Sequence, residues 1–274
     1  MKGKAASRSA EQEESKSGAV KSADRVLDLF ELLGRWDREM SHTEIAAALA
    51  IPKSSLTLLL RNLVARNYVE FSPVSKGYRL GEAFSRLANQ SGRQFDLVAC
   101  AEPILKKITA ALGESSALNR LKGHDAEVVA TVPSPQRLLM HMRTGDLAPL
   151  YATSGGKAIL AFLPDALLKE YLAAVRFEPI TPKTIRSVTT LKREIEAVRR
   201  TGVAYSFEEF TPGIVGVGAA VLSPNNHALG SLNVAMPAVR STPQVLERAA
   251  QWLQRSAHEL QQQLSRAAPA STAQ

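Results

Sequence analysis

Polar and basic side chains gather on one side of the stretch from Lys53 to Arg66. Leucines there recur three and four residues apart, so a helix would turn one face toward a core. The opposite face carries hydroxyl, amide and cationic groups: Lys53, Ser54, Ser55, Thr57, Arg61 and Asn62. Such groups approach phosphates and base edges closely, and Ser54 or Ser55 is also able to cap the first turn of the helix. The pattern suits a nucleic-acid duplex, and a solvated helix face is the alternative.

Two further cations follow in a segment with hairpin character. Residues 68–71 alternate as in a strand, residues 72–77 have turn chemistry, and residues 78–80 are predicted to form the returning strand. Lys76 and Arg79 on this hairpin are natural partners of a phosphate backbone. Each charge taken alone is more often solvated surface, and the shared location favours contact with DNA.

A third feature is the run Thr153-Ser154-Gly155-Gly156-Lys157, which opens a predicted helix. The free backbone N–H groups and the positive dipole end of a helix start favour an anion, and glycines let it come close. The spacing is not that of a phosphate-binding P-loop. A helix cap with glycines for tight packing is the alternative.

Patterns for catalysis or metal binding are absent from the sequence. The five histidines are scattered without metal-ligand spacing. There is no Gly-x-Ser-x-Gly nucleophile motif and no dinucleotide-binding fingerprint. The single cysteine, Cys100, excludes an intrachain disulfide and a Cys-based zinc site. We therefore expect no catalytic residue, no metal and no cofactor.

Length and charge agree with this interpretation. A chain of 274 residues favours two domains over one core. The net charge of +8 suits a polyanionic partner, although many basic proteins bind no nucleic acid. Apolar runs are too short for a membrane helix, and the N-terminus lacks the apolar core of a signal peptide. We expect a cytoplasmic protein with no membrane association.

The elements that would present the Lys53–Arg66 face are predicted by periodicity. Helical spacing covers residues 20–34, and a second, short helix begins at a cap formed by Ser41 or Thr43. A tight turn at residues 50–52 leads into the third helix. Helix, short helix, turn, helix and hairpin are the order of a winged helix-turn-helix domain. An ordinary helical subdomain used for protein contacts is the alternative.

The rest of the chain alternates between strand and helix patterns. Residues 81–112 are mainly helical, with a break near residues 91–92. Strands are predicted at residues 116–121, 127–132, 138–143, 203–207, 216–222 and 229–236. Helices are predicted at residues 154–163, 165–172, 191–200 and 246–264.

These patterns predict a two-domain α+β protein in five parts. Residues 1–18 lack large apolar side chains and are expected to form a disordered tail. The winged helix-turn-helix domain is predicted at residues 19–82, followed by a linker helix at residues 83–95. The α/β domain is predicted at residues 96–265, and residues 266–274 are expected to fray.

These motifs resemble those of the IclR family of bacterial regulators from about Val20 to Gln263. In the first domain the resemblance lies in Glu44-Ile45-Ala46, Pro52-Lys53-Ser54-Ser55 and Tyr78-Arg79-Leu80-Gly81. In the second it lies in Pro149-Leu150-Tyr151-Ala152-Thr153, Gly156-Lys157-Ala158, Glu209, Gly213, Pro237 and Arg240. The resemblance implies a winged helix joined to a GAF-like effector-binding domain. It also implies homodimers, often paired into homotetramers, on palindromic operators in double-stranded DNA.

The resemblance further implies a small-molecule site over the helix start at Ser154 and against the C-terminal strands. Carried over by position, the effector-binding residues are Met140, Ser154, Gly155, Ser206, Ile214, Gly216, Asn233 and Ala235. Ser206 replaces a commonly acidic residue, Gly216 a common cysteine, and Asn233 with Ala235 a pair often seen as serines. We infer a roomier pocket that suits a larger carboxylate, such as an aromatic acid, better than a two- or three-carbon acid.

Two further features leave alternatives open. Arg137, His141 and Arg143 alternate on a predicted strand and could pair with the carboxylate, or they could form a solvated strand face. Leu58 stands where the family usually has an arginine, and an exposed leucine there could touch a thymine methyl group or pack on a neighbour.

The function expected from the sequence is that of a ligand-responsive, DNA-binding transcriptional regulator of catabolic genes, with a repressor favoured over an activator. Effector binding near Ser154 would shift the packing of the second domain, and the linker would pass this change to the recognition helices. The alternatives are a small-molecule sensor or adaptor that does not bind DNA and, less favoured, an enzyme.

Overall fold

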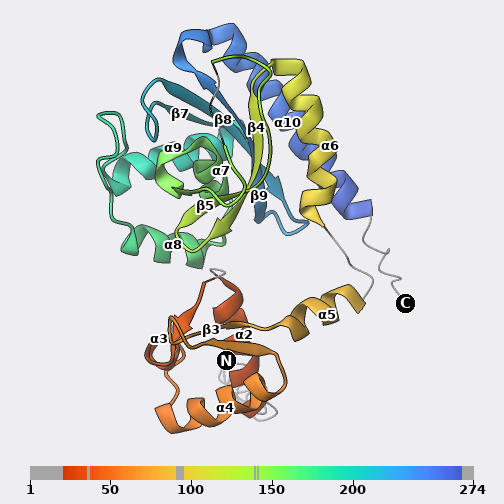
Figure 1. Cartoon of the computed structure of the whole chain (residues 1–274). Coiled ribbons are helices and arrows are strands. Elements are labelled where there is room, and N and C mark those ends of the chain that lie inside the picture. The colour runs from red at the N-terminus through yellow and green to blue at the C-terminus, as the bar shows by residue number, and fades with distance from the viewer. Residues whose placement is uncertain (1–20, 36–37, 91–95, 139, 141, 267–274) are drawn as a thin grey trace, which may run out of the picture. The chain divides into compact units, whose positions relative to one another are not determined.

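The computed structural model describes residues 21–35, 38–90, 96–138, 140 and 142–266. The chain divides into two compact units, within residues 1–90 and 91–274 (Figure 1). The predicted tail at residues 1–18 and the predicted frayed segment from residue 267 onward lie outside the described residues, whereas Arg266 still belongs to a helix.

The first unit consists of helices and a small sheet. Its elements are α2 (Lys21–Arg35), β1 (Met40–Ser41), α3 (His42–Ala48), α4 (Lys53–Ala65), β2 (Val69–Ser72), β3 (Gly77–Leu80) and α5 (Glu82–Gln90). The strands pair antiparallel in the order β1-β3-β2. The chain bends by 115° between α3 and α4, which is the arrangement of a helix-turn-helix motif. The β2–β3 hairpin is the wing.

Apolar side chains at helical spacing hold these elements together. Leu29 of α2, Ile45 of α3 and Leu56 and Leu60 of α4 are almost completely buried in one cluster. Burying such side chains contributes roughly 1.5–3 kcal/mol each. The core therefore fixes which face of α4 points inward and leaves the opposite face to the exterior.

The helix caps agree with the prediction at α3 and differ from it at α4. Ser41 caps α3 in a capping box, because its hydroxyl accepts the Glu44 N–H and the Glu44 carboxylate accepts the Ser41 N–H. The prediction that Ser54 or Ser55 caps α4 is wrong. Pro52 occupies the N-cap position without a side-chain cap, so both serines lie inside the first turn of the helix.

The second unit is an α/β domain. Its elements are α6 (Leu97–Leu112), β4 (Ser115–Lys122), β5 (Asp125–Val132), β6 (Leu147–Pro149), the 3-10 helix η1 (Leu150–Ala152), α7 (Ser154–Ala161), α8 (Asp165–Ala174), α9 (Val188–Thr201), β7 (Ala204–Phe207), β8 (Ile214–Leu222), β9 (Ala228–Pro237), the 3-10 helix η2 (Ala238–Arg240) and α10 (Pro243–Arg266). All strand pairs are antiparallel, in the order β6-β5-β4-β9-β8-β7.

Helices cover both faces of this sheet. Figure 1 shows α6 and α10 side by side on one face and α7, α8 and α9 on the other. The core cluster joins Leu105 of α6 and Leu253 of α10 to Val217 and Leu232 of the central strands. The sheet is therefore the middle of three layers, and α7 packs against β8 and β9.

The prediction of a strand at residues 138–143 is wrong. The described residues of this stretch lie outside any strand, and the place beside β5 is taken by β6, with Asp125 paired to Pro149. Met140 and Met142 of this stretch instead line a cavity. Met140 and Met142 are half-buried, and they border this cavity rather than a neighbouring strand.

No single helix among the described residues is long and apolar enough to cross a membrane, and α3 with α4 meets that criterion only as a bent pair.

Candidate DNA-binding surface and effector cavity

The outer face of α4 has the residues that the sequence predicts for DNA contact. All six predicted α4 residues are exposed: Lys53, Ser54, Ser55, Thr57, Arg61 and Asn62. Leu56, Leu60 and Leu63 are buried on the inner face. Because α4 contains no acidic residue, its exposed face carries only neutral and positive side chains.

One of these residues already has a structural partner. The Thr57 hydroxyl donates to the Lys53 carbonyl oxygen over 2.8 Å and lies 3.0 Å from His42 Nε2. The contact with His42 joins the start of α3 to α4. Thr57 therefore helps to hold the two helices of the motif together.

The two cations of the wing differ in their surroundings. Lys76 is exposed on the turn, with a φ of 54°. Arg79 donates from Nε and Nη2 to Oε2 of Glu70 on the neighbouring strand, over 3.0 and 2.7 Å. Lys76 is thus available to a phosphate, whereas Arg79 would have to share its charge with Glu70.

A cavity of about 320 Å³ lies in the second unit, between the start of α7, strands β8 and β9, and the segment around Met140 and Asp146. All eight residues predicted for the effector line this one cavity: Met140, Ser154, Gly155, Ser206, Ile214, Gly216, Asn233 and Ala235. The structure therefore brings together residues from five separate stretches of the chain.

Other lining residues were missed by the sequence reasoning. They include Asn119, Met142, Asp146, Phe210 and Thr211. Asn119 is the last residue in the buried part of β4, and its Nδ2 donates to Asn233 Oδ1 over 2.8 Å. A buried amide in a strand was the one signal that could have marked this position.

Two buried hydroxyl groups face each other across Gly216. A Cβ atom added at Gly216 would lie 2.7 Å from Ser154 Oγ and 2.8 Å from Ser206 Oγ. Ser154 is 2% exposed and Ser206 is 8% exposed, and neither hydroxyl has a hydrogen-bond partner among the described residues. The missing side chain at residue 216 therefore leaves space bounded by two hydroxyl groups that can bind a polar group.

The start of α7 closes this end of the cavity. Thr153 is the N-cap, and its hydroxyl accepts the Gly156 N–H over 3.1 Å. A Cβ at Gly155 would lie 2.6 Å from Asn119 Nδ2, and one at Gly156 would lie 2.4 Å from the Leu150 carbonyl oxygen. Tight packing is therefore a sufficient reason for both glycines, and Ser154 and Gly155 of this helix start line the cavity.

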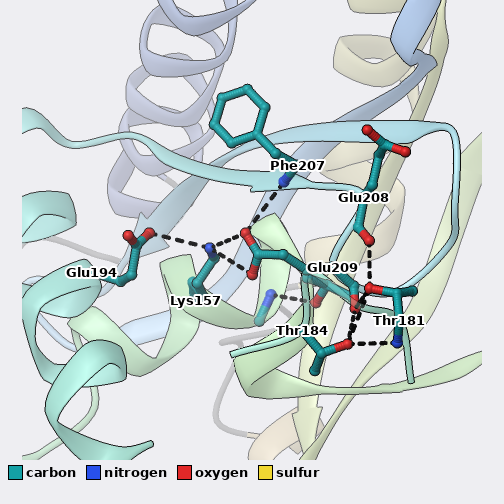
Figure 2. Close-up of polar contacts among 9 residues, drawn as sticks. Lys157, Thr181, Thr184, Glu194, Phe207, Glu208 and Glu209 are labelled. Carbon is teal, nitrogen blue, oxygen red and sulfur yellow. Dashed lines mark hydrogen bonds and ion pairs between the residues drawn. The ribbon is translucent and has the colours of Figure 1, made fainter. Parts of the chain in front are cut away.

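Lys157 of α7 forms a buried ion pair with Glu209 (Figure 2). Lys157 is completely buried, and its Nζ donates to both carboxylate oxygens of Glu209, over 2.9 and 3.0 Å, and to Glu194 over 3.2 Å. Burial raises the pKa of the Glu209 carboxyl, and the ammonium group of Lys157 opposes that shift. The Glu209 carbonyl oxygen also accepts the Thr184 hydroxyl over 2.6 Å. The chain is thus fixed just before Phe210 and Thr211.

The arginines suggested as partners of a carboxylate are not part of the cavity. Arg137 and Arg143 are exposed, neither lines the cavity, and His141 lies outside the described residues. Among the described lining residues the only charged group is Asp146, which is exposed and accepts the Arg143 N–H over 2.7 Å. A bound anion would have to rely on N–H and hydroxyl donors.

Comparison with known proteins identifies both units. Residues 22–73 match the model of the IclR helix-turn-helix domain, and residues 90–263 match that of the bacterial transcriptional regulator IclR C-terminal domain. The HTH-type transcriptional regulator Rv1719 of Mycobacterium tuberculosis is 33% identical over 232 residues, which is 85% of this chain and 88% of the relative.

Solved structures share the fold. The crystal structure of IclR from Thermotoga maritima has 27% sequence identity and a TM-score of 0.60, covering 90% of this chain and 99% of that one. An IclR homologue of Microbacterium hydrocarbonoxydans, crystallised with 4-hydroxybenzoate, has 19% identity and a TM-score of 0.57, covering 89% of this chain and 98% of that one.

These matches confirm the predicted family and the two-domain fold class, and the relatives are regulators rather than enzymes. The chain is a member of the IclR family of bacterial transcriptional regulators, with a DNA-binding helix-turn-helix domain and a C-terminal effector-binding domain.

Proposed function

We propose that this regulator binds a small organic carboxylate in the cavity at the start of α7 and changes its affinity for an operator in response. The observation that carries the proposal is that two hydroxyl groups without a hydrogen-bond partner among the described residues lie at one cavity beside a helix start. The hydroxyls of Ser154 and Ser206 border this space, and Ser154 and Gly155 at the start of α7 line it. Helix N-termini with such donors bind carboxylates.

The remaining walls favour an effector with an apolar body. Met140, Phe210 and Ile214 line the cavity, and its volume of about 320 Å³ falls within the usual size of small-molecule sites. An aromatic acid combines the required carboxylate group with an apolar ring. The Microbacterium homologue was crystallised with 4-hydroxybenzoate, so a related fold accepts a ligand of this class in that protein.

On the DNA side, we propose that α4 enters the major groove of a palindromic operator and the wing contacts its backbone. The predicted contacts are Lys53, Ser54, Ser55, Thr57, Arg61, Asn62, Lys76 and Arg79. Of these, Arg61 and Lys76 have exposed cationic side chains for which no ion pair is found in the described part of the chain. A homodimer or homotetramer in the cytoplasm would present two such helices to the two half-sites.

Regulation requires that the effector bind the two forms of the protein unequally. A ligand shifts operator affinity only by its differential affinity for the DNA-binding and the DNA-free arrangement. Release of DNA on effector binding would make the protein a repressor, and we propose this sign for catabolic genes near its own.

The test is a titration of the purified full-length protein with duplex from the promoter of its own gene. The measurement is repeated with a panel of two-carbon, three-carbon and aromatic acids at constant salt. We expect an aromatic acid to raise the operator Kd of the wild type and to lose this effect in Asn233→Leu, which removes the amide at the cavity wall. A response to two- and three-carbon acids only would contradict the effector class, and a protein that binds acids without binding duplex would be a sensor.

A further inference from the structure

Leu58 is an exposed leucine at the centre of the outer face of α4. Its exposed fraction is 67%, whereas Leu56 and Leu60 are 0% and 1% exposed. With about 100° of rotation per residue, Leu58 lies about 200° round the helix axis from each of them. Its side chain therefore points directly away from the core, and packing on a neighbour covers only a small part of it.

Polar donors surround this apolar side chain. Ser54 lies one turn before Leu58, and Arg61 and Asn62 lie one turn after it, so all three share its face. The face has no acidic residue. Its partner must therefore be anionic overall and must also offer an apolar group at the centre of the contact.

The major groove of DNA has both properties. Phosphates flank the groove, and thymine is the only standard base that presents a methyl group there. A water-exposed leucine gains free energy by covering that methyl, whereas the other base edges present mainly polar atoms that would lose hydrogen bonds to water. No such argument favours a protein partner, whose surface would have to match an apolar centre within a ring of cationic and hydroxyl groups.

We propose that Leu58 contacts the 5-methyl group of one thymine in each operator half-site and so sets the base preference at that position. The proposal rests on entry of α4 into the major groove, which belongs to the proposed function. It adds a base-specific apolar contact to the polar and phosphate contacts of the same helix. Burial of one methyl-sized group corresponds to about a fourfold change in affinity.

The experiment removes the methyl group without changing base pairing. The operator is mapped by footprinting on the promoter of the protein's own gene, and each thymine in turn is replaced by deoxyuridine. For the wild type we expect the Kd to rise about fourfold at one thymine per half-site. For Leu58→Ala we expect weaker binding to the thymine duplex and no further loss from deoxyuridine at that position.

A matched control is Leu27→Ala on α2, which also removes an exposed leucine, 58% exposed in this case. This variant is expected to keep the wild-type response to deoxyuridine, whatever its overall affinity. The proposal is overturned if, at every position, deoxyuridine raises the Kd of Leu58→Ala by the same factor as that of the wild type. It is also overturned if Leu58→Ala changes the oligomeric state and its Kd still rises when deoxyuridine replaces the thymine. Failure of the wild type to bind any duplex would instead contradict DNA binding itself.

Discussion

The ammonium group of Lys157 lies 2.9 and 3.0 Å from the two carboxylate oxygens of Glu209, and the lysine side chain is completely buried. Lys157 belongs to α7, whose start closes one end of the cavity, and Glu209 directly precedes Phe210 and Thr211, which also line it. A buried charge pair thus fixes two walls of the cavity relative to each other.

Lys157→Met is expected to lower the free energy of unfolding by about 3–5 kcal/mol, because it leaves the Glu209 carboxylate buried without its cation. Chemical denaturation of the full chain measures this loss. The neighbouring exposed pair of Lys183 and Glu208 supplies the control. Lys183→Met should leave the unfolding midpoint nearly unchanged, since solvent screens that pair. Equal losses in the two variants would contradict the special role of the buried pair.

Gly216→Ala is expected to reduce effector binding and stability together, because its methyl group would lie within 2.8 Å of the Ser154 and Ser206 hydroxyls. The loss of affinity and stability caused by Gly216→Ala should be smaller in a Ser154→Ala, Ser206→Ala background, because those two oxygen atoms are absent there. Calorimetric titration with the acid that shifts operator binding measures affinity, and thermal unfolding measures stability. Additive effects of the three substitutions would show that residue 216 does not lie between these hydroxyls.

The capping box of α3 should give the DNA-binding unit a dependence on pH. The Glu44 carboxylate accepts the Ser41 N–H over 2.7 Å, and this hydrogen bond lowers the pKa of Glu44 from its ordinary value of 4.5. A group with a lowered folded-state pKa stabilises the fold above its unfolded pKa, and that contribution is lost as the pH falls through the lowered value.

We therefore expect Glu44→Gln to speed amide hydrogen exchange in α3 at neutral pH, and the difference from the wild type to disappear below the lowered pKa. Ser41→Ala, which removes the cap itself, should destabilise α3 by about 1 kcal/mol at both pH values. A Glu44→Gln effect of the same size at every pH would show that the carboxylate charge contributes nothing.

The winged helix could be predicted from the sequence because its signals are local. Leucine spacing in α4 and the Ser41 cap each specify an element within a few residues. The cap of α4 could not be predicted, since the choice between Pro52 and Ser54 depends on where the preceding turn ends, and Ala50 takes a left-handed φ of 51° in that turn.

The cavity shows a different limit. Its eight predicted residues came from family positions, and the structure places them around one space. The place of Asn119 at the cavity depends on the pairing of β4 with β9, more than a hundred residues away, and that of Phe210 depends on the placement of a loop, neither of which a local pattern specifies. Met142 likewise lines the cavity through the placement of a segment that the sequence patterns predicted to be a strand.

Contact of α4 and the wing with DNA is the central claim, and one titration tests it most directly. The Kd of the wild type for its promoter duplex is compared with that of Arg61→Ala, Lys76→Ala over a salt series centred on physiological ionic strength. Removal of two cations from the interface predicts much weaker binding and a shallower salt dependence, by about one unit of log–log slope for each phosphate that is no longer neutralised. Unchanged affinity and slope in the double variant would contradict DNA binding through this surface.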